Sequence, residues 1–158
     1  MESPRLCSTA VASWAEFETA APDFAARVRL LMTARKHLTM ATLRWDGSPR
    51  ISGTEVEFAG GRLRIGSMPG ALKARDLLRD ARIAIHGPSN DPPADNAGAW
   101  TGEAKVAGAA IEVDSKDASH RFEIDIREAV ITGLDESGRR LVIESWTPER
   151  GLKRLERD

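Results

Sequence analysis

The hydrophobic periodicity of the chain changes once, at His37, and this change limits the possible folds more than any other feature. Before His37, apolar residues such as Phe24, Val28 and Leu31 recur at the three- and four-residue spacing of an amphipathic helix. After His37, apolar and polar residues alternate in short segments separated by glycine turns such as Asp46-Gly47. The pattern therefore predicts a helical N-terminus followed by an antiparallel β-meander.

The helical part is expected in two pieces. Ser13 is placed to cap a helix over residues 14–20, with Glu16 in the first turn, where an acidic side chain complements the helix dipole. Pro22, which the first position of a helix tolerates, opens a second helix over residues 22–35. We expect this second helix to cover one end of a barrel or sheet.

The rest of the chain is predicted to be mainly strands. A short helix over residues 69–80 is expected to interrupt them, and residues 87–98, rich in Pro, Asn and Asp, are expected to form a mobile loop. A slip in the alternation near Gly108 indicates a β-bulge. The predicted strands cover residues 38–43, 49–58, 62–67, 81–86, 99–113, 121–127 and 141–146. Because consecutive strands of this length usually close to remove their edges, we predict a mainly β (α+β) fold in which six or seven antiparallel strands form a barrel, with N-terminal helices and one inserted helix.

Length and composition predict one domain of 158 residues. We divide it into a helical N-terminus (1–36), the barrel (37–147) and a polar C-terminal tail (148–158). Lysine and arginine (23) nearly balance aspartate and glutamate (24) and are mixed with them along the chain, so no basic face for nucleic acid is expected.

Two further features of the sequence bear on where in the cell the protein is expected. No apolar run approaches the roughly 18 residues that a membrane span needs, and the apolar stretch near the N-terminus is too short and interrupted for a signal peptide. The single cysteine, Cys7, excludes an internal disulfide and a multi-cysteine metal site. We therefore expect a cytoplasmic protein without a membrane partner.

A candidate binding site lies where the third predicted strand passes into the inserted helix. Gly66 and Gly70 let a ligand approach the backbone closely, and the first helical turn offers free N–H groups that attract anions. The hydroxyl of Ser67 and the ammonium of Lys73 would complete a phosphate site. The alternative is a simple turn with a solvated lysine, and the segment has neither the P-loop nor the dinucleotide glycine spacing.

Other chemistry-bearing residues give weaker signals. His37, His86 and His120 have no carboxylate or cysteine neighbours at ligand spacing, so we predict no metal site. His86 ends a strand, where it would face the ring of a bound cofactor. Trp146 is expected either to pack in the core or to cover the cofactor of a second subunit. No Ser-His-Asp, Cys-His or paired-carboxylate set is present, so we predict no catalytic side chain and expect a cofactor to supply the chemistry.

A longer segment resembles a known family. Residues 41–87 read ATLRWDGSPRISGTEVEFAGGRLRIGSMPGALKARDLLRDARIAIHG, and GEAKVAG and WTPERGLKR follow at 102–108 and 146–154. In this order they resemble the pyridoxamine 5′-phosphate oxidase-like superfamily of FMN-binding split β-barrels, especially its flavin- and deazaflavin-dependent oxidoreductases. The resemblance covers roughly residues 37–154.

The resemblance implies that this barrel is a six-stranded antiparallel split β-barrel. It also implies a homodimer whose barrels meet face to face, with two cofactor sites at the interface. It implies that residues 50–54 lie along the isoalloxazine ring, largely through backbone groups, and that Ser67 and Lys73 hold the phosphate. The full predicted cofactor site is Arg50, Ile51, Ser52, Gly53, Thr54, Gly66, Ser67, Met68, Leu72, Lys73, His86 and Trp146.

The chain also departs from the family pattern. Members that bind FMN tightly often carry Ser-Arg-Lys where this chain has Ala71-Leu72-Lys73, so one bidentate phosphate donor is replaced by leucine. Arg75 or Arg79 would have to compensate. The substrate-binding arginine and histidine of true pyridoxamine phosphate oxidases have no match near the C-terminus, so we do not predict that enzyme.

We therefore expect an oxidoreductase that passes a hydride between FMN or a deazaflavin (coenzyme F-420) and a small unsaturated or aromatic acceptor. A deazaflavin's acidic tail needs a basic groove, for which Arg44, Arg62, Arg64 and Arg79 are candidates unless they are solvated surface charges. The alternative is a non-catalytic carrier of flavin, haem or another planar ligand on the same barrel, and a third possibility is a scaffold without a cofactor.

Overall fold

Strands account for most of the regular structure in the computed structural model, which describes residues 10–158. Cys7 lies outside the described residues. The helices are α1 (Trp14–Ala20), α2 (Pro22–Met32) and α3 (Leu72–Arg79), with one 3₁₀ turn, η1 (Ala97–Ala99). The strands are β1 (Leu38–Leu43), β2 (Pro49–Thr54), β3 (Val56–Ala59), β4 (Arg62–Ser67), β5 (Arg82–His86), β6 (Glu103–Val113), β7 (His120–Leu134), β8 (Leu141–Thr147) and β9 (Gly151–Arg157).

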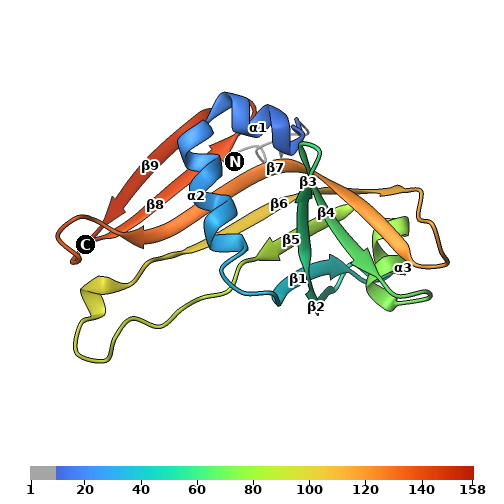
Figure 1. Ribbon diagram of the computed structural model, residues 1–158, viewed down its shortest axis with the longest axis horizontal. Helices are drawn as coiled ribbons and strands as arrows, with labels where there is room; N and C mark the ends of the chain where they lie inside the picture. Colours follow the sequence, from blue (N-terminus) through green and yellow to red (C-terminus); the bar gives the residue numbers. More distant parts are fainter. Residues whose placement is uncertain (1–9) are drawn as a thin grey trace, which may run out of the picture.

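The strands form one antiparallel sheet that divides at β7 (Figure 1). Strand β6 pairs with β7 along one edge over nearly its whole length. On the other edge, β4 pairs with the first part of β7, with Leu63 opposite Ile124, and β8 pairs with the last part, with Ala129 opposite Trp146. The sheet order β2-β1-β5-β6-β7-β4-β3 leaves β2 and β3 unpaired on their outer sides, so the barrel is open. The predicted fold class, a mainly β split barrel with N-terminal helices and one inserted helix, is confirmed.

Over residues 10–158 the sheet contains nine strands, two more than the seven segments that the pattern predicted. One predicted strand, 49–58, is divided at Glu55 into β2, which pairs with β1, and β3, which pairs with β4. The chain turns a corner there and passes from one part of the split sheet to the other. The polar C-terminal segment also forms a strand, β9, on the edge of β8.

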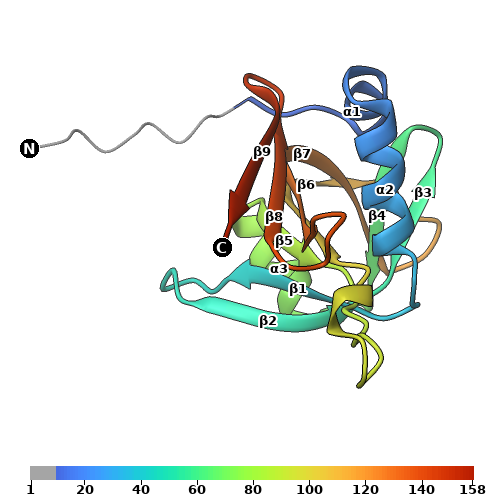
Figure 2. The ribbon, with the colours of Figure 1, turned by 90° about the vertical axis from the view of Figure 1, so that its left-hand side faces the viewer.

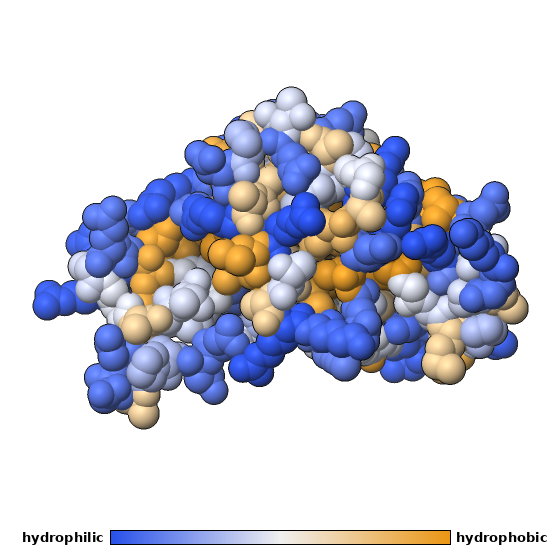
Figure 3. Space-filling view, in the orientation of Figure 1, coloured by the Kyte–Doolittle hydropathy of each residue, from blue (hydrophilic) through white to orange (hydrophobic). Residues whose placement is uncertain are grey.

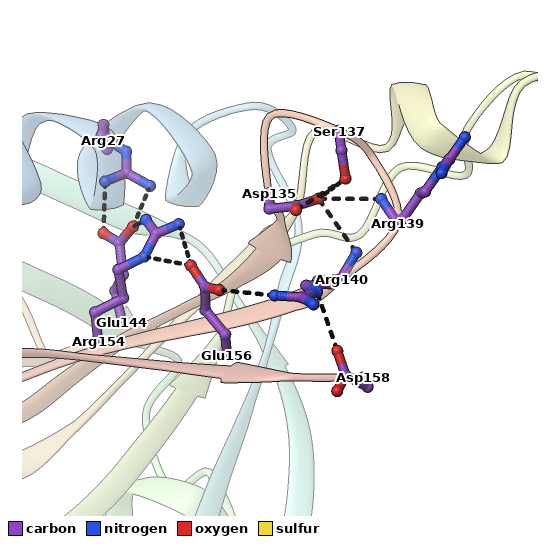
Figure 4. A network of polar contacts seen from close by, with 9 residues as sticks. All are labelled: Arg27, Asp135, Ser137, Arg139, Arg140, Glu144, Arg154, Glu156 and Asp158. Atoms are coloured by element: carbon purple, nitrogen blue, oxygen red, sulfur yellow. Dashed lines mark hydrogen bonds and ion pairs between the residues drawn. The ribbon is translucent and has the colours of Figure 1, made fainter.

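Ion pairs explain why the polar segment of β9 is ordered (Figure 4). The carboxylate of Glu144 on β8 is nearly buried, and it accepts hydrogen bonds from Arg27 of α2 at 2.6 Å and from Arg154 of β9 at 3.3 Å. Arg154 also bonds to Glu156. A charge that lies between two packed elements needs such partners, and here they join the C-terminal strand to a helix.

The helix starts follow the local sequence signals. The Ser13 hydroxyl accepts a hydrogen bond from the Glu16 N–H, and the Glu16 carboxylate accepts one from the Ser13 N–H, which completes a capping box. Pro22 occupies the first turn of α2, as expected. Helix α2 ends at Met32, three residues before the predicted boundary.

The core lies between α1, α2 and the inner face of the sheet, and Figure 2 shows α2 with β8 to one side of it and β3 to the other. The rings of Trp14, Phe17 and Trp146 are almost fully buried there, and the centroids of Phe17 and Trp146 lie 4.5 Å apart. In the face drawn in Figure 3, hydrophobic side chains show across the middle and hydrophilic ones cover the ends. The two helices therefore close one side of the open sheet with an aromatic cluster.

The predicted bulge is present in the β6–β7 ladder. Ala107 pairs with Glu128 and Gly108 pairs with Ile126, so Arg127 has no partner on β6. A Cβ atom at Gly108 would lie 1.8 Å from the carbonyl oxygen of Asp125, so only glycine fits at this point. The bulge is therefore fixed by the close approach of the two backbones.

Candidate functional site

A hollow of about 680 Å³ lies between the ends of β2 and β4 and the start of α3. We call it the α3 hollow. Half of the twelve predicted site residues line it: Gly53, Thr54, Gly66, Ser67, Met68 and Lys73. Its volume falls in the range of small-molecule and cofactor sites.

The α3 hollow owes its shape to the turn between β4 and α3. Strand β4 ends at Ser67, which pairs with His120 of β7, and the chain then turns through Gly70, whose φ of 72° is unfavourable for other residues. Helix α3 begins at Leu72 without a side-chain cap, because Ala71 at the N-cap has no acceptor. No acidic residue stands in the first turn, so the free N–H groups there are available to an anion.

Lys73 projects from this first turn toward β2. Its ammonium donates a hydrogen bond of 2.7 Å to the carbonyl oxygen of Gly53. An ammonium has three donors, so a second contact to a phosphate oxygen is compatible with this bond. Lys73 therefore links the helix terminus to the strand that the resemblance places along the flavin ring.

Ser67 supplies a test of whether the hollow suits a phosphate. Its hydroxyl oxygen is buried and has no hydrogen-bond partner among the described residues. A buried hydroxyl without a partner costs free energy, and a rotation about χ1 changes the direction in which it donates. The donor set of hydroxyl, ammonium and helix N–H groups fits an anionic oxygen.

A buried carboxylate fixes α3 against the β1–β2 hairpin. Asp76 is 3% exposed and accepts hydrogen bonds of 2.7 Å from Arg50 Nε, 2.7 Å from Thr42 Oγ1 and 3.0 Å from Arg79 Nη2. Burial raises the pKa of Asp76, but the hydrogen bonds from Arg50, Thr42 and Arg79 together outweigh it and lower the pKa to about 2. The side chain of Arg50 is thus bound to Asp76, and its backbone remains for the predicted role.

The other predicted residues lie elsewhere. Ile51 and His86 line a second hollow, of about 410 Å³, on the outer face of β1, β5 and β6. Ser52 is half-buried on β2 and Leu72 is exposed at the start of α3. Trp146 is 3% exposed, packs on Phe17 and lines neither hollow.

The arginines considered for a phosphate or an acidic tail are mostly engaged. Arg79 donates to Asp76 and to the Leu43 carbonyl, and Arg62 and Arg64 both pair with Glu123. Arg75 differs, because its guanidinium lies over the turn, 3.9 Å from where a Cβ at Gly70 would stand. The guanidinium of Arg75 therefore lies beside the turn, although Arg75 does not line the α3 hollow.

Comparison with known proteins supports the fold assignment. No family model and no curated protein sequence matches the chain. Solved structures do match: PhzG from Burkholderia lata, in complex with tetrahydrophenazine-1-carboxylic acid, is 11% identical with a TM-score of 0.60 over 90% of this chain and 89% of that chain. A pyridoxamine 5′-phosphate oxidase-related, FMN-binding protein from Nostoc punctiforme is 10% identical with a TM-score of 0.57 over 90% of this chain and 97% of that chain. A heme-binding protein from Mycobacterium smegmatis is 13% identical with a TM-score of 0.57 over 82% and 86%.

The chain has the pyridoxamine 5′-phosphate oxidase-like fold. At these identities the likeness extends to the fold, and it does not distinguish the flavin branch from the deazaflavin branch. In the part of the chain that the structure describes, no helix is long and apolar enough to span a membrane. Within residues 10–158, no group of three or more His, Cys, Asp or Glu side chains is placed to hold a metal ion.

The fold also brings into the α3 hollow three residues that lie outside both the predicted cofactor site and the β4–α3 turn. His37, Glu55 and Ser119 line it. The Glu55 carboxylate lies 3.5 Å from the Lys36 ammonium and 3.8 Å from His37 Nε2. These residues come from a strand start, a strand break and a distant turn, so no local pattern could have grouped them.

Proposed function

We propose that the chain binds a flavin-type cofactor, FMN or a deazaflavin, by its phosphate in the α3 hollow. We further propose that it transfers a hydride between this cofactor and a small unsaturated or aromatic acceptor, as a cytoplasmic homodimer. The observation that carries the proposal is the unpartnered hydroxyl of Ser67 beside Lys73 and an uncapped helix start. The FMN-binding protein of the same fold adds support.

Each part of the hollow has a defined role in this proposal. Ser67, Lys73 and the first N–H groups of α3 hold the phosphate, and the backbone of residues 50–54 lies along the ring. The Lys73–Gly53 bond sets the distance between the phosphate contacts and that strand. The flavin, when bound, supplies the hydride chemistry, and the chain supplies binding and orientation.

The test compares FMN with riboflavin, which has the same ring and no phosphate. We expect wild-type protein to bind FMN more tightly than riboflavin in a fluorescence titration. Lys73→Ala should weaken FMN binding by about 10- to 100-fold, the range for a lost charged hydrogen bond, and leave riboflavin binding unchanged. Lys73→Arg should recover part of the loss, and Lys116→Ala, in an exposed loop, is the control.

Equal affinities for FMN and riboflavin would remove the phosphate site from the proposal. A parallel titration with coenzyme F-420 decides between the two cofactor types. If the protein binds neither FMN nor coenzyme F-420, the proposed oxidoreductase function is excluded.

A second candidate is a carrier of flavin, haem or another planar ligand without turnover. It is favoured by Leu72, an exposed leucine where tightly FMN-binding relatives often carry a phosphate arginine, and by the heme-binding protein of the same fold. Stopped-flow reoxidation of the reduced cofactor separates the two functions. An oxidoreductase accelerates reoxidation with an acceptor, whereas a carrier shows ligand binding alone.

A further inference from the structure

A row of directly opposed residues, with three alanines at its centre, crosses the outer face of the sheet. Ile51, Ala41, Ala84, Ala107 and Glu128 lie directly opposite one another on β2, β1, β5, β6 and β7. The three alanines, one on each of three neighbouring strands, thus form a furrow. Ile51, with 76% of its surface exposed, bounds it at one end and Glu128 at the other. A surface of this shape lets another backbone or side chain approach closely.

Two hollows share the alanine furrow. One, of about 410 Å³, reaches Ile51 and Glu128, and the other, of about 250 Å³, reaches Pro49 and Arg127. The three alanines line both hollows. The furrow and its two hollows therefore form one continuous apolar surface with an acidic and a basic residue at its β7 end.

The bulge at Gly108 creates this charged end. In a regular strand, successive side chains point to opposite faces of the sheet. Because Arg127 is the extra residue of the bulge, both Arg127 and Glu128 line hollows on the outer face. The close approach of Gly108 to Asp125 thus sets the register of the β6–β7 ladder and also places both Arg127 and Glu128 on the outer face.

These two charges lack partners within the described residues. The Nε atom of Arg127 is buried without an acceptor, and both side chains are half-buried. None of the ion pairs within residues 10–158 includes Arg127 or Glu128. This holds although Lys105 lines the same hollow as Glu128. Partly buried charges without partners are costly, so an occupant that supplies one charge of each sign would stabilise this face.

We propose that a second copy of the chain covers this face, and that Arg127 of each subunit pairs with Glu128 of the other across a two-fold axis close to the bulge. This inference rests on the homodimer of the proposed function and adds its surface and its specificity. A two-fold interface is self-complementary, so adjacent charges of opposite sign form two equivalent pairs. A small carboxylate ligand would satisfy Arg127 but leave Glu128 without a partner.

The test exchanges the two charges. Sedimentation equilibrium of the full chain gives the dimer dissociation constant of wild type, Arg127→Glu, Glu128→Arg and the double variant. Each single variant places like charges opposite one another and should raise the dissociation constant at least 10-fold. The double variant should return it to within a few-fold of wild type, and circular dichroism checks that each variant is folded.

Matched controls use the same exchanges at exposed turn positions, Arg139→Glu and Glu136→Arg, which should leave the dissociation constant unchanged. Single variants that stay as dimeric as wild type, a double variant that stays monomeric, or a monomeric wild type would each overturn the inference. The same samples are titrated with FMN. Tight FMN binding to a monomeric wild type would retain the cofactor proposal and reject the interface.

Discussion

Arg50 Nε lies 2.7 Å from a carboxylate oxygen of Asp76, and this ion pair joins the edge strand β2 to helix α3. Both side chains are largely buried, and the same carboxylate oxygen also accepts a hydrogen bond from Thr42. One turn earlier on α3, Lys73 bonds to Gly53 of β2. The helix that carries the proposed phosphate contacts is therefore held to the proposed ring-binding strand at two points.

Asp76→Ala should lower the free energy of unfolding at pH 7 by about 3 kcal/mol, because it leaves the buried Arg50 without its counter-charge. Urea denaturation followed by circular dichroism measures this. Glu18→Ala, which removes an exposed ion pair to Arg29, is the control and should change stability by less than about 0.5 kcal/mol. Equal effects of the two variants would contradict the role assigned to Asp76.

The same carboxylate predicts a dependence of stability on pH. Asp76 has a folded-state pKa of about 2, below its ordinary value of 3.8, so its stabilisation is fully present above about pH 4. The stabilisation is lost as the pH falls through about 2, and a shift of this size corresponds to about 2 kcal/mol. The difference in unfolding free energy between wild type and Asp76→Asn should therefore shrink between pH 5 and pH 2. A constant difference over this interval would show that the carboxylate charge is not the cause.

Ser67→Ala should separate stability from binding. Without ligand, the variant should be as stable as wild type or more stable by up to about 1 kcal/mol, because it removes a buried hydroxyl that has no partner. Its FMN affinity should fall several-fold while its riboflavin affinity is retained. Thermal unfolding and fluorescence titration provide the two readouts, with Ser137→Ala as a surface control. A loss of stability without a loss of FMN affinity would mean that the hydroxyl has a structural role.

Gly108→Ala should destabilise the chain by about 3 kcal/mol, because the added methyl group collides with the Asp125 carbonyl and forces the two strands apart. Gly133→Ala, on β7 where it pairs with β8, is the control, since the nearest atom to its added Cβ would be 3.9 Å away. Denaturant titrations of both variants measure the difference. If the two glycines tolerate alanine equally, the bulge is not set by Gly108.

Local features were predictable because their causes lie within a few residues. The Ser13 cap, Pro22 at the start of α2, the Asp46-Gly47 hairpin and the bulge opposite Gly108 each follow from a short pattern and are present in the structure. The alternation of apolar and polar residues from His37 onward determined that the fold is mainly β. The local pattern was enough to single out the turn at Ser67 and Lys73, and the order of the motifs, through their resemblance to a known superfamily, predicted the split barrel.

Contacts between distant segments were decided by the tertiary structure alone. The polar C-terminal segment forms strand β9 because Glu144 and Arg154 meet across the β8–β9 ladder. No pattern within the segment predicts this strand. The sheet directs Arg50 to Asp76, places His86 in a different hollow from Lys73, and buries Trp146 against Phe17. A side chain's partner depends on which faces the strand pairing brings together, and that pairing is a property of the whole sheet. The sequence by itself therefore determined the kind of fold and the chemistry available at the start of α3, and the packed sheet decided which residues share the site.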